Sequence, residues 1–185
     1  MRRLALLTLM ALVLAACAGP GPTPTPRGEA PVDAAAMRAL LTPADVEAVG
    51  GPGGLGVELD DLLPVVADTN PTRAAQLAAW YLLTIHQGQT GPALVFAVLE
   101  FHEQADAEAH LGTVLTGPGF RPLEMTGGGQ GALAEPDEAT GIGAALVALK
   151  GRRVLSLHTT IAHGIPPLVD AAGVEALARV VQDRL

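Results

Sequence analysis

Hydrophobic residues along the chain form two pairs of strand-like runs. The first pair is 79–87 and 93–102, separated by a glycine-rich turn. The second run of this pair is apolar on both faces, which is typical of a central strand covered on each side. The other pair is 144–149 and 153–161, joined by a Lys-Gly turn. These patterns predict two β-hairpins.

Three further segments carry helical signals. Thr42, Pro43 and Asp45 fit the cap, first and third positions of a helix that ends at Gly50. Apolar residues at helical spacing predict amphipathic helices over 103–116 and 167–184. The periodic positions are Ala107, Leu111, Val114 and Leu115 in the first, and Val174, Leu177 and Val181 in the second.

The last strand-like run, 153–161, alternates apolar and polar side chains. Leu155, Leu157 and Ile161 alternate with Ser156, His158 and Thr160. Successive side chains of a strand point to opposite faces, so one face of this strand should pack in the core and the other should be more polar.

The remaining segments have weaker patterns. Residues 51–76 show no clear period and are predicted to be irregular or to hold a weak strand, 120–126 to be a short strand, and 127–131 to be a flexible glycine loop. The order helix, hairpin, helix, hairpin, helix predicts an α+β fold. We expect an antiparallel sheet of two hairpins flanked by helices in a single domain.

The N-terminus has the features of an export signal. Arg2 and Arg3 precede 13 uncharged residues, Leu4 to Ala16, a run shorter than the roughly 20 residues that span a bilayer. The following Leu-Ala-Ala-Cys17 resembles the lipobox of bacterial lipoproteins. That resemblance implies cleavage before Cys17, a diacylglycerol on its thiol and a signal peptide over 1–16. The alternative is an ordinary exported protein with a chance cysteine.

A tract rich in Pro, Gly and Thr follows the cysteine. It favours extended, polyproline-like conformations, so 17–32 is predicted to be a tether, although proline-rich tracts also serve as recognition ligands. We expect the globular domain to occupy 33–185. The membrane, reached through lipid on Cys17, is then one partner, and the expected location is the extracytoplasmic side of the cell envelope.

Charge and cysteine content exclude several classes of protein. The chain has 11 basic and 19 acidic residues, a net charge of −8, and Lys150 is its single lysine. Nucleic-acid binding needs clustered Lys and Arg, so we expect no nucleic-acid partner, and an acidic substrate is equally disfavoured. The one cysteine is consumed by lipid, which leaves none for a structural disulfide.

No catalytic set stands out. Ser156 is the only serine, and it lies inside a predicted strand instead of the sharp turn that hydrolases use. Gly127, Gly129 and Ala132 match a dinucleotide-binding spacing in letter, but Pro136 breaks the helix that should follow. We therefore predict no cofactor. Trp80 and Tyr81 fit the core better than a pocket lining, and the acids Glu135, Asp137 and Glu138 fit a solvated loop.

A metal site is the best chemical alternative. His102, Asp106 and His110 recur every four residues, so a helix would place two imidazoles and a carboxylate on one face beside Glu103. Such donors suit a transition metal such as zinc. The competing interpretation is an ordinary solvated helix face. His158 and His163 are five apart and point to opposite faces of a regular strand.

Three segments resemble a known family. They are LLTPADV at 40–46, FAVLEF at 96–101 followed by a helix, and GQGALA at 129–134 before the last hairpin. Together they resemble exported bacterial lipoproteins with a Mog1/PsbP-like domain. The resemblance implies the same α+β architecture, a non-enzymatic role and no catalytic residue.

The sequence thus favours a lipid-anchored extracytoplasmic lipoprotein whose domain is a non-enzymatic binding or interaction module. Its expected partner, besides the membrane, is an envelope protein or a small apolar ligand. The alternative is a metal-binding protein or metal-dependent enzyme that uses His102, Asp106 and His110.

Overall fold

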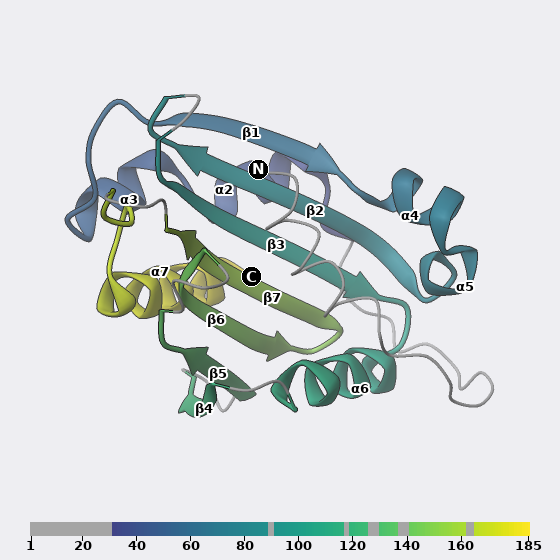
Figure 1. Cartoon of the computed structure of the whole chain (residues 1–185). Helices are drawn as coiled ribbons and strands as arrows, with labels where there is room; N and C mark the ends of the chain where they lie inside the picture. Colours follow the sequence, from purple (N-terminus) through teal and green to yellow (C-terminus); the bar gives the residue numbers. More distant parts are fainter. Residues whose placement is uncertain (1–30, 89–90, 117–118, 126–129, 137–140, 162–164) are drawn as a thin grey trace.

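The computed structural model describes residues 31–185, apart from 89–90, 117–118, 126–129, 137–140 and 162–164. Within these ranges one seven-stranded antiparallel sheet holds the domain together, in the order β1-β2-β3-β7-β6-β5-β4 (Figure 1). The strands are β1 Gly56–Asp61, β2 Leu77–His86, β3 Ala93–Phe101, β4 Phe120–Glu124, β5 Gln130–Ala134, β6 Ile142–Lys150 and β7 Arg153–Thr160. The helices are α2 Ala34–Leu40, α3 Pro43–Ala48, α4 Leu63–Thr69, α5 Pro71–Ala74, α6 Gln104–Leu115 and α7 Ala171–Arg184.

The predicted hairpins are present and form the centre of the sheet. β2 pairs with β3 and β6 pairs with β7, and β3 and β7 join the two hairpins side by side. The fold is therefore α+β with an antiparallel sheet, as the sequence indicated. The sheet is larger than two hairpins, because β1 extends it at one edge and β5 and β4 at the other.

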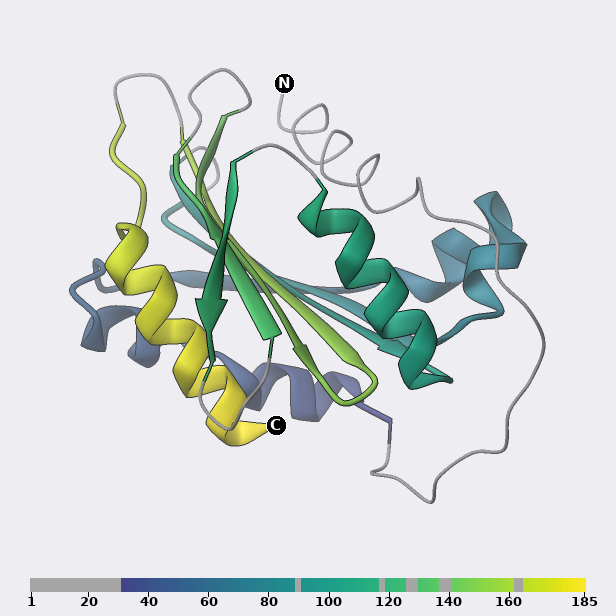
Figure 2. The same ribbon diagram turned by 90° about the horizontal axis from the view of Figure 1, so that it is seen from below.

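Helices cover both faces of the sheet (Figure 2). The first face packs against α2, α3 and α7, and side chains such as Phe96, Leu146 and Leu157 fill it. The second face packs against α6, α4 and α5, through side chains such as Trp80 and Phe101. Alternate residues of each central strand feed the two cores, so β3 and β6 are apolar on both sides.

Local signals explain where the helices begin. Thr42 caps α3 and forms a capping box with Asp45, as predicted. The side chain of Asp33 accepts from the Ala36 N–H to start α2, and Asp170 accepts from the Gly173 N–H to start α7. The closing helix is thus confirmed, with its first residue four positions after the predicted one.

Four expectations need correction. The segment 51–76, predicted to be irregular or a weak strand, contains β1, α4 and α5. The helix α2 was not expected at all. Residues 130 and 131, predicted to end the flexible glycine loop, begin strand β5, while 127–129 lie outside the described residues. The second face of β7 carries the polar residues, as predicted. His158 on that face is buried, however, and so is Thr159 on the first face, so β7 is covered on both sides.

The two edge strands carry features that oppose further pairing. β4 contains Pro122, which has no N–H to donate, and β1 ends in the acids Asp60 and Asp61. Sheet extension by another chain is therefore disfavoured at both edges. Among the described residues, no helix combines the length and apolar character needed to cross a membrane.

Candidate functional site

A buried carboxylate lies where β3 ends and β7 begins, and we call this end of the sheet the tether end, after the predicted tether that precedes residue 33. Glu100 has 0% of its surface exposed. Arg152 Nη2 lies 3.0 Å from its Oε1, and Arg153 Nε lies 3.3 Å from its Oε2. The backbone N–H of Val32 donates to Oε2 across 2.9 Å. A fully buried charge is tolerated only with such partners, so we treat these four residues as one unit, the Glu100 cluster.

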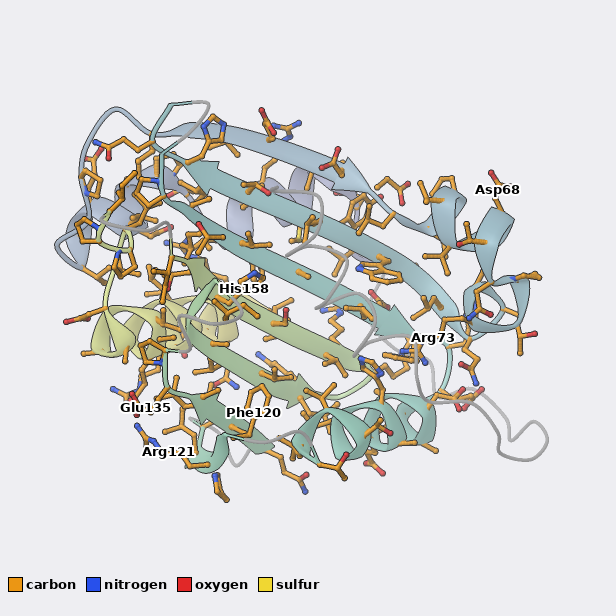
Figure 3. The ribbon with its side chains drawn as sticks, viewed as in Figure 1. Asp68, Arg73, Phe120, Arg121, Glu135 and His158 are labelled. Carbon is orange, nitrogen blue, oxygen red and sulfur yellow. The ribbon has the colours of Figure 1, made fainter. Side chains whose placement is uncertain are left out.

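A second polar group is buried between α5, α6 and the second face. Arg73 is 3% exposed, and its Nη2 donates to His110 Nδ1 across 2.8 Å. Its guanidinium carbon lies 4.8 Å from the centre of the Phe101 ring, and its Nη1 donates to Gln76 Oε1 at 3.2 Å. Figure 3 shows Arg73 beside the start of α6. The guanidinium is thus held by an imidazole, an amide and an aromatic face.

The imidazole of His110 is neutral. Because Arg73 can only donate, Nδ1 must accept, which leaves the proton on Nε2. Burial, together with the charge of Arg73, lowers the pKa of His110 to about 4. The Arg73 cation therefore donates to a neutral imidazole, and protonation of His110 at low pH would remove this hydrogen bond.

A third buried ionisable group, His158, stands on the second face in the middle of the sheet (Figure 3). It is 7% exposed, and burial lowers its pKa to about 4. Its neighbours across the strands are Val95 and Ala145. No hydrogen bond joins its ring to another described residue, and its nitrogens are not among the fully enclosed polar atoms that lack a partner. A neutral imidazole with unused hydrogen-bonding capacity on an apolar surface is uncommon in a core.

The surroundings of His158 are small and mostly apolar. Ala97, Val147 and Ser156 form the next row toward α6 on the same face. The apolar cluster beneath α6 reaches Ala97 and Val147 but includes neither Val95 nor Ala145. We call the part of the face around His158 the small-residue surface, which consists of Val95, Ala97, Ala145, Ser156 and His158. Ser156 is partly exposed and the other four are buried, so a ligand reaches this surface only if its cover opens. The surface combines apolar contact area with one neutral hydrogen-bonding ring.

The predicted metal ligands are not brought together. His102 is exposed in the turn after β3, whereas His110 is 2% exposed and directed at Arg73. Asp106 lies between them in the first turn of α6. Within the described part of the chain, no group of three His, Cys, Asp or Glu side chains could hold a metal ion. The face that the four-residue spacing predicted does not exist, because His102 precedes the helix.

The other candidates have clear positions. Ser156 and His158 share a face but are two residues apart, about 6.6 Å along a strand, so they cannot form a nucleophile–base hydrogen bond. Trp80 is 3% exposed and packs in the second core, as predicted. Glu135 forms an exposed ion pair with Arg121 at 3.5 Å. Cys17, Asp137, Glu138 and His163 lie outside the described residues.

Sequence reasoning missed Glu100 and Arg73. Glu100 interrupts the apolar run of β3, and an acid inside a strand covered on both faces must find cationic partners. That signal was available, and the Arg152-Arg153 pair of the next hairpin is the matching partner. Arg73 offered no comparable signal, because it lies in a segment without a recognisable period.

Comparisons with known proteins show a likeness in structure but no match in sequence. No protein-family model matches the chain, and no curated protein matches it. Among solved structures, it is similar to the extracellular domain of PknH from Mycobacterium tuberculosis, with a TM-score of 0.50 and 16% identity. The alignment covers 85% of this chain and 98% of that one. At this identity the likeness concerns architecture, and this chain shares its α+β fold with that domain.

Proposed function

We propose that this chain is a lipid-anchored lipoprotein of the extracytoplasmic side of the cell envelope, with diacylglycerol on Cys17. The support is the coincidence of a basic start, a 13-residue uncharged run and the single cysteine after Leu-Ala-Ala. The Mog1/PsbP-like resemblance agrees with this, as does a structural relative whose own description is extracellular. With Arg2 and Arg3 removed, nine basic residues face 19 acidic ones, so lipid and not charge would hold the protein to the bilayer.

We further propose that the domain is a non-enzymatic binding module for a small apolar ligand. The observation that carries this proposal is His158, a buried neutral imidazole without a hydrogen-bond partner among the described residues, set on the small-residue surface. Ligand sites are mostly apolar with few polar groups that orient the ligand, and this surface has that composition. An apolar segment of an envelope protein is the other occupant that such a surface fits.

Anchoring is tested by replacing the cysteine in the full chain. Cys17→Ser should move the protein from the detergent phase to the aqueous phase and block cleavage before residue 17. Thr23→Ser, in the same predicted tether, is the matched control and should leave both properties unchanged. A Cys17→Ser protein that still fractionates with membranes in high salt would rule out anchoring through this residue.

Binding is tested with N-phenylnaphthylamine, a neutral apolar dye that brightens in apolar surroundings. We expect saturable binding that Ala145→Leu weakens, because the added carbons occupy the small-residue surface. Val65→Ala, at a side chain that is 53% exposed on α4, is the control and should bind as the unaltered protein does. Equal binding by Ala145→Leu, in a protein that circular dichroism shows to be folded, contradicts the assignment of this surface.

A further inference from the structure

Glu100, the most deeply buried charged residue among those described, accepts a hydrogen bond from Val32, where the predicted tether joins the domain. Val32 precedes the cap residue of α2, so its N–H lies outside the helix and needs another acceptor. Glu100, 68 residues later in the chain, supplies that acceptor. The Val32 side chain is 6% exposed in the first core, so apolar packing and a charge-assisted hydrogen bond act together.

The two arginines make this acceptor rigid. Each holds a different oxygen of the Glu100 carboxylate. Arg152 also donates through Nη1 to the carbonyl oxygen of His102 at 3.2 Å, which ties the β6–β7 turn to the end of β3. The carboxylate therefore cannot rotate away from Val32 without losing ion-pair contacts.

Strand register places this cluster at one end of the molecule. Glu100 pairs with Ala79 near the start of β2 and with Arg153 at the start of β7. The opposite end carries the turn after His86, which pairs with Gly56 and Ala93. The nine residues of β3 separate the two ends by about 30 Å at 3.3 Å per residue.

We propose that the Glu100 cluster, by holding Val32 at the tether end of the sheet, biases that end toward the membrane and the β2–β3 turn away from it. This inference rests on the proposed anchoring at Cys17. Residues 17–31 span about 45 Å when extended at roughly 3 Å each, a length comparable with the domain. Because the tether limits only the height of Val32, orientations with the tether end down are favoured over inverted ones.

The orientation is measured on the full lipidated protein in phosphatidylcholine vesicles that carry an energy acceptor on their headgroups. Cys17 is blocked by lipid, so a single new thiol takes the donor dye. Ala75→Cys lies exposed at the tether end, and Gln87→Cys lies exposed at the opposite end. We expect more transfer from position 75 than from position 87. Equal transfer, or more from position 87, overturns the proposal. A protein that does not bind the vesicles contradicts the proposed anchoring instead.

The hydrogen bond from Val32 to Glu100 is tested by amide hydrogen exchange of Val32, a measurement that does not need the membrane. The unaltered chain should protect this amide, and Glu100→Leu should speed its exchange by about tenfold or more, as expected for loss of a charge-assisted hydrogen bond. Glu100→Gln keeps an acceptor oxygen and should exchange at an intermediate rate. Glu58→Gln, at an acid exposed on β1, is the control. A Val32 amide that exchanges freely in the unaltered protein contradicts the hold, even if both Glu100 variants fail to fold.

Discussion

The two faces of the sheet are buried in different ways. The first face meets α2, α3 and α7 largely through apolar side chains, and its charged groups are paired: the buried Glu100 contacts Arg152 and Arg153. At the rim, Arg184 of α7 binds Asp45 of α3 through two contacts of 2.7 Å. The second face buries ionisable groups within its area, namely Arg73, His110 and His158. The comparison indicates that the first face combines apolar packing with paired charges. The second face supplies polar chemistry and a dependence on pH.

The largest expected effect breaks the first face. Leu157→Asp places an unpaired carboxylate where the side chain is 2% exposed, at a cost of several kcal/mol against a total stability of about 5–15 kcal/mol. The domain should largely unfold at room temperature. Ser156→Ala, one residue earlier on the second face, should change stability by less than about 1 kcal/mol. Thermal melts compare the two, and a Leu157→Asp protein that melts like the unaltered one would refute the packing of β7.

The next effect is the pH dependence of the second face. The pKa values of His110 and His158 are lowered from 6.5 to about 4 in the folded protein. The unfolded chain binds protons first, so the free energy of unfolding should fall as pH drops from about 6.5 to about 4, by several kcal/mol and at most about 7 kcal/mol. Urea melts at pH 7.5 and 4.5 measure this loss, and His158→Phe should reduce it. A free energy of unfolding that stays constant over this interval contradicts the neutral, buried state of both rings.

A smaller effect concerns the rim of the first face. The ion pair with Arg184 and the capping contacts with Thr42 lower the pKa of Asp45 to about 2. This stabilisation is present above about pH 3.8 and is lost as pH falls toward 2, below the histidine window. Asp45→Asn should cost about 1 kcal/mol in urea melts, and Arg184→Gln less, because it leaves the capping box intact. A greater loss for Arg184→Gln would reverse the assigned order of the two contributions.

The smallest expected effect is that of metal. His102 is exposed outside α6 and His110 is bound to Arg73, so zinc or a chelator should leave the melting temperature unchanged. Stoichiometric zinc that raises the melting temperature, with the rise abolished by His102→Ala, would restore the metal alternative.

The central hairpins could be predicted because their signals are local. Apolar runs bounded by Gly and Pro determine β2, β3, β6 and β7, and these strands form the two hairpins that the sequence indicated. Strand β5 could not be predicted, because Gly131 and Ala132 show no alternation of apolar and polar side chains. It forms because β6 offers a complete edge, with Ala132 opposite Val147.

The secondary structure of the segment before β2 could not be predicted, for a related reason. β1 ends in two acids and pairs with β2, whose length of 10 residues exposes an edge that any neighbouring segment can use. Helix α4 has no side-chain cap at Leu62, and its start is marked only by Pro64 and by Asp61, whose side chain accepts from the Leu63 N–H at 3.1 Å. Helix α2 opens with three alanines, and its apolar contact begins only at Met37.

In the candidate site, too, local features could be predicted from the sequence and contacts between distant residues could not. The polarity of His158 was visible in the alternation of β7, but its burial depends on how the whole sheet is covered. The predicted metal set assumed that His102 belongs to the helix, and the helix begins two residues later at Gln104. Contacts between residues distant in the chain, such as Glu100 with Val32 and Arg73 with His110, could not be derived from spacing.

The central claim is that this domain is held to a membrane by lipid on Cys17. The most direct test is the intact mass of the full-length protein purified from membranes of a bacterium that processes lipoproteins, followed by fragmentation of its N-terminal peptide. We predict a chain that begins at Cys17, with diacylglycerol on the thiol. A free thiol at Cys17, or an N-terminus at another residue, would contradict the account.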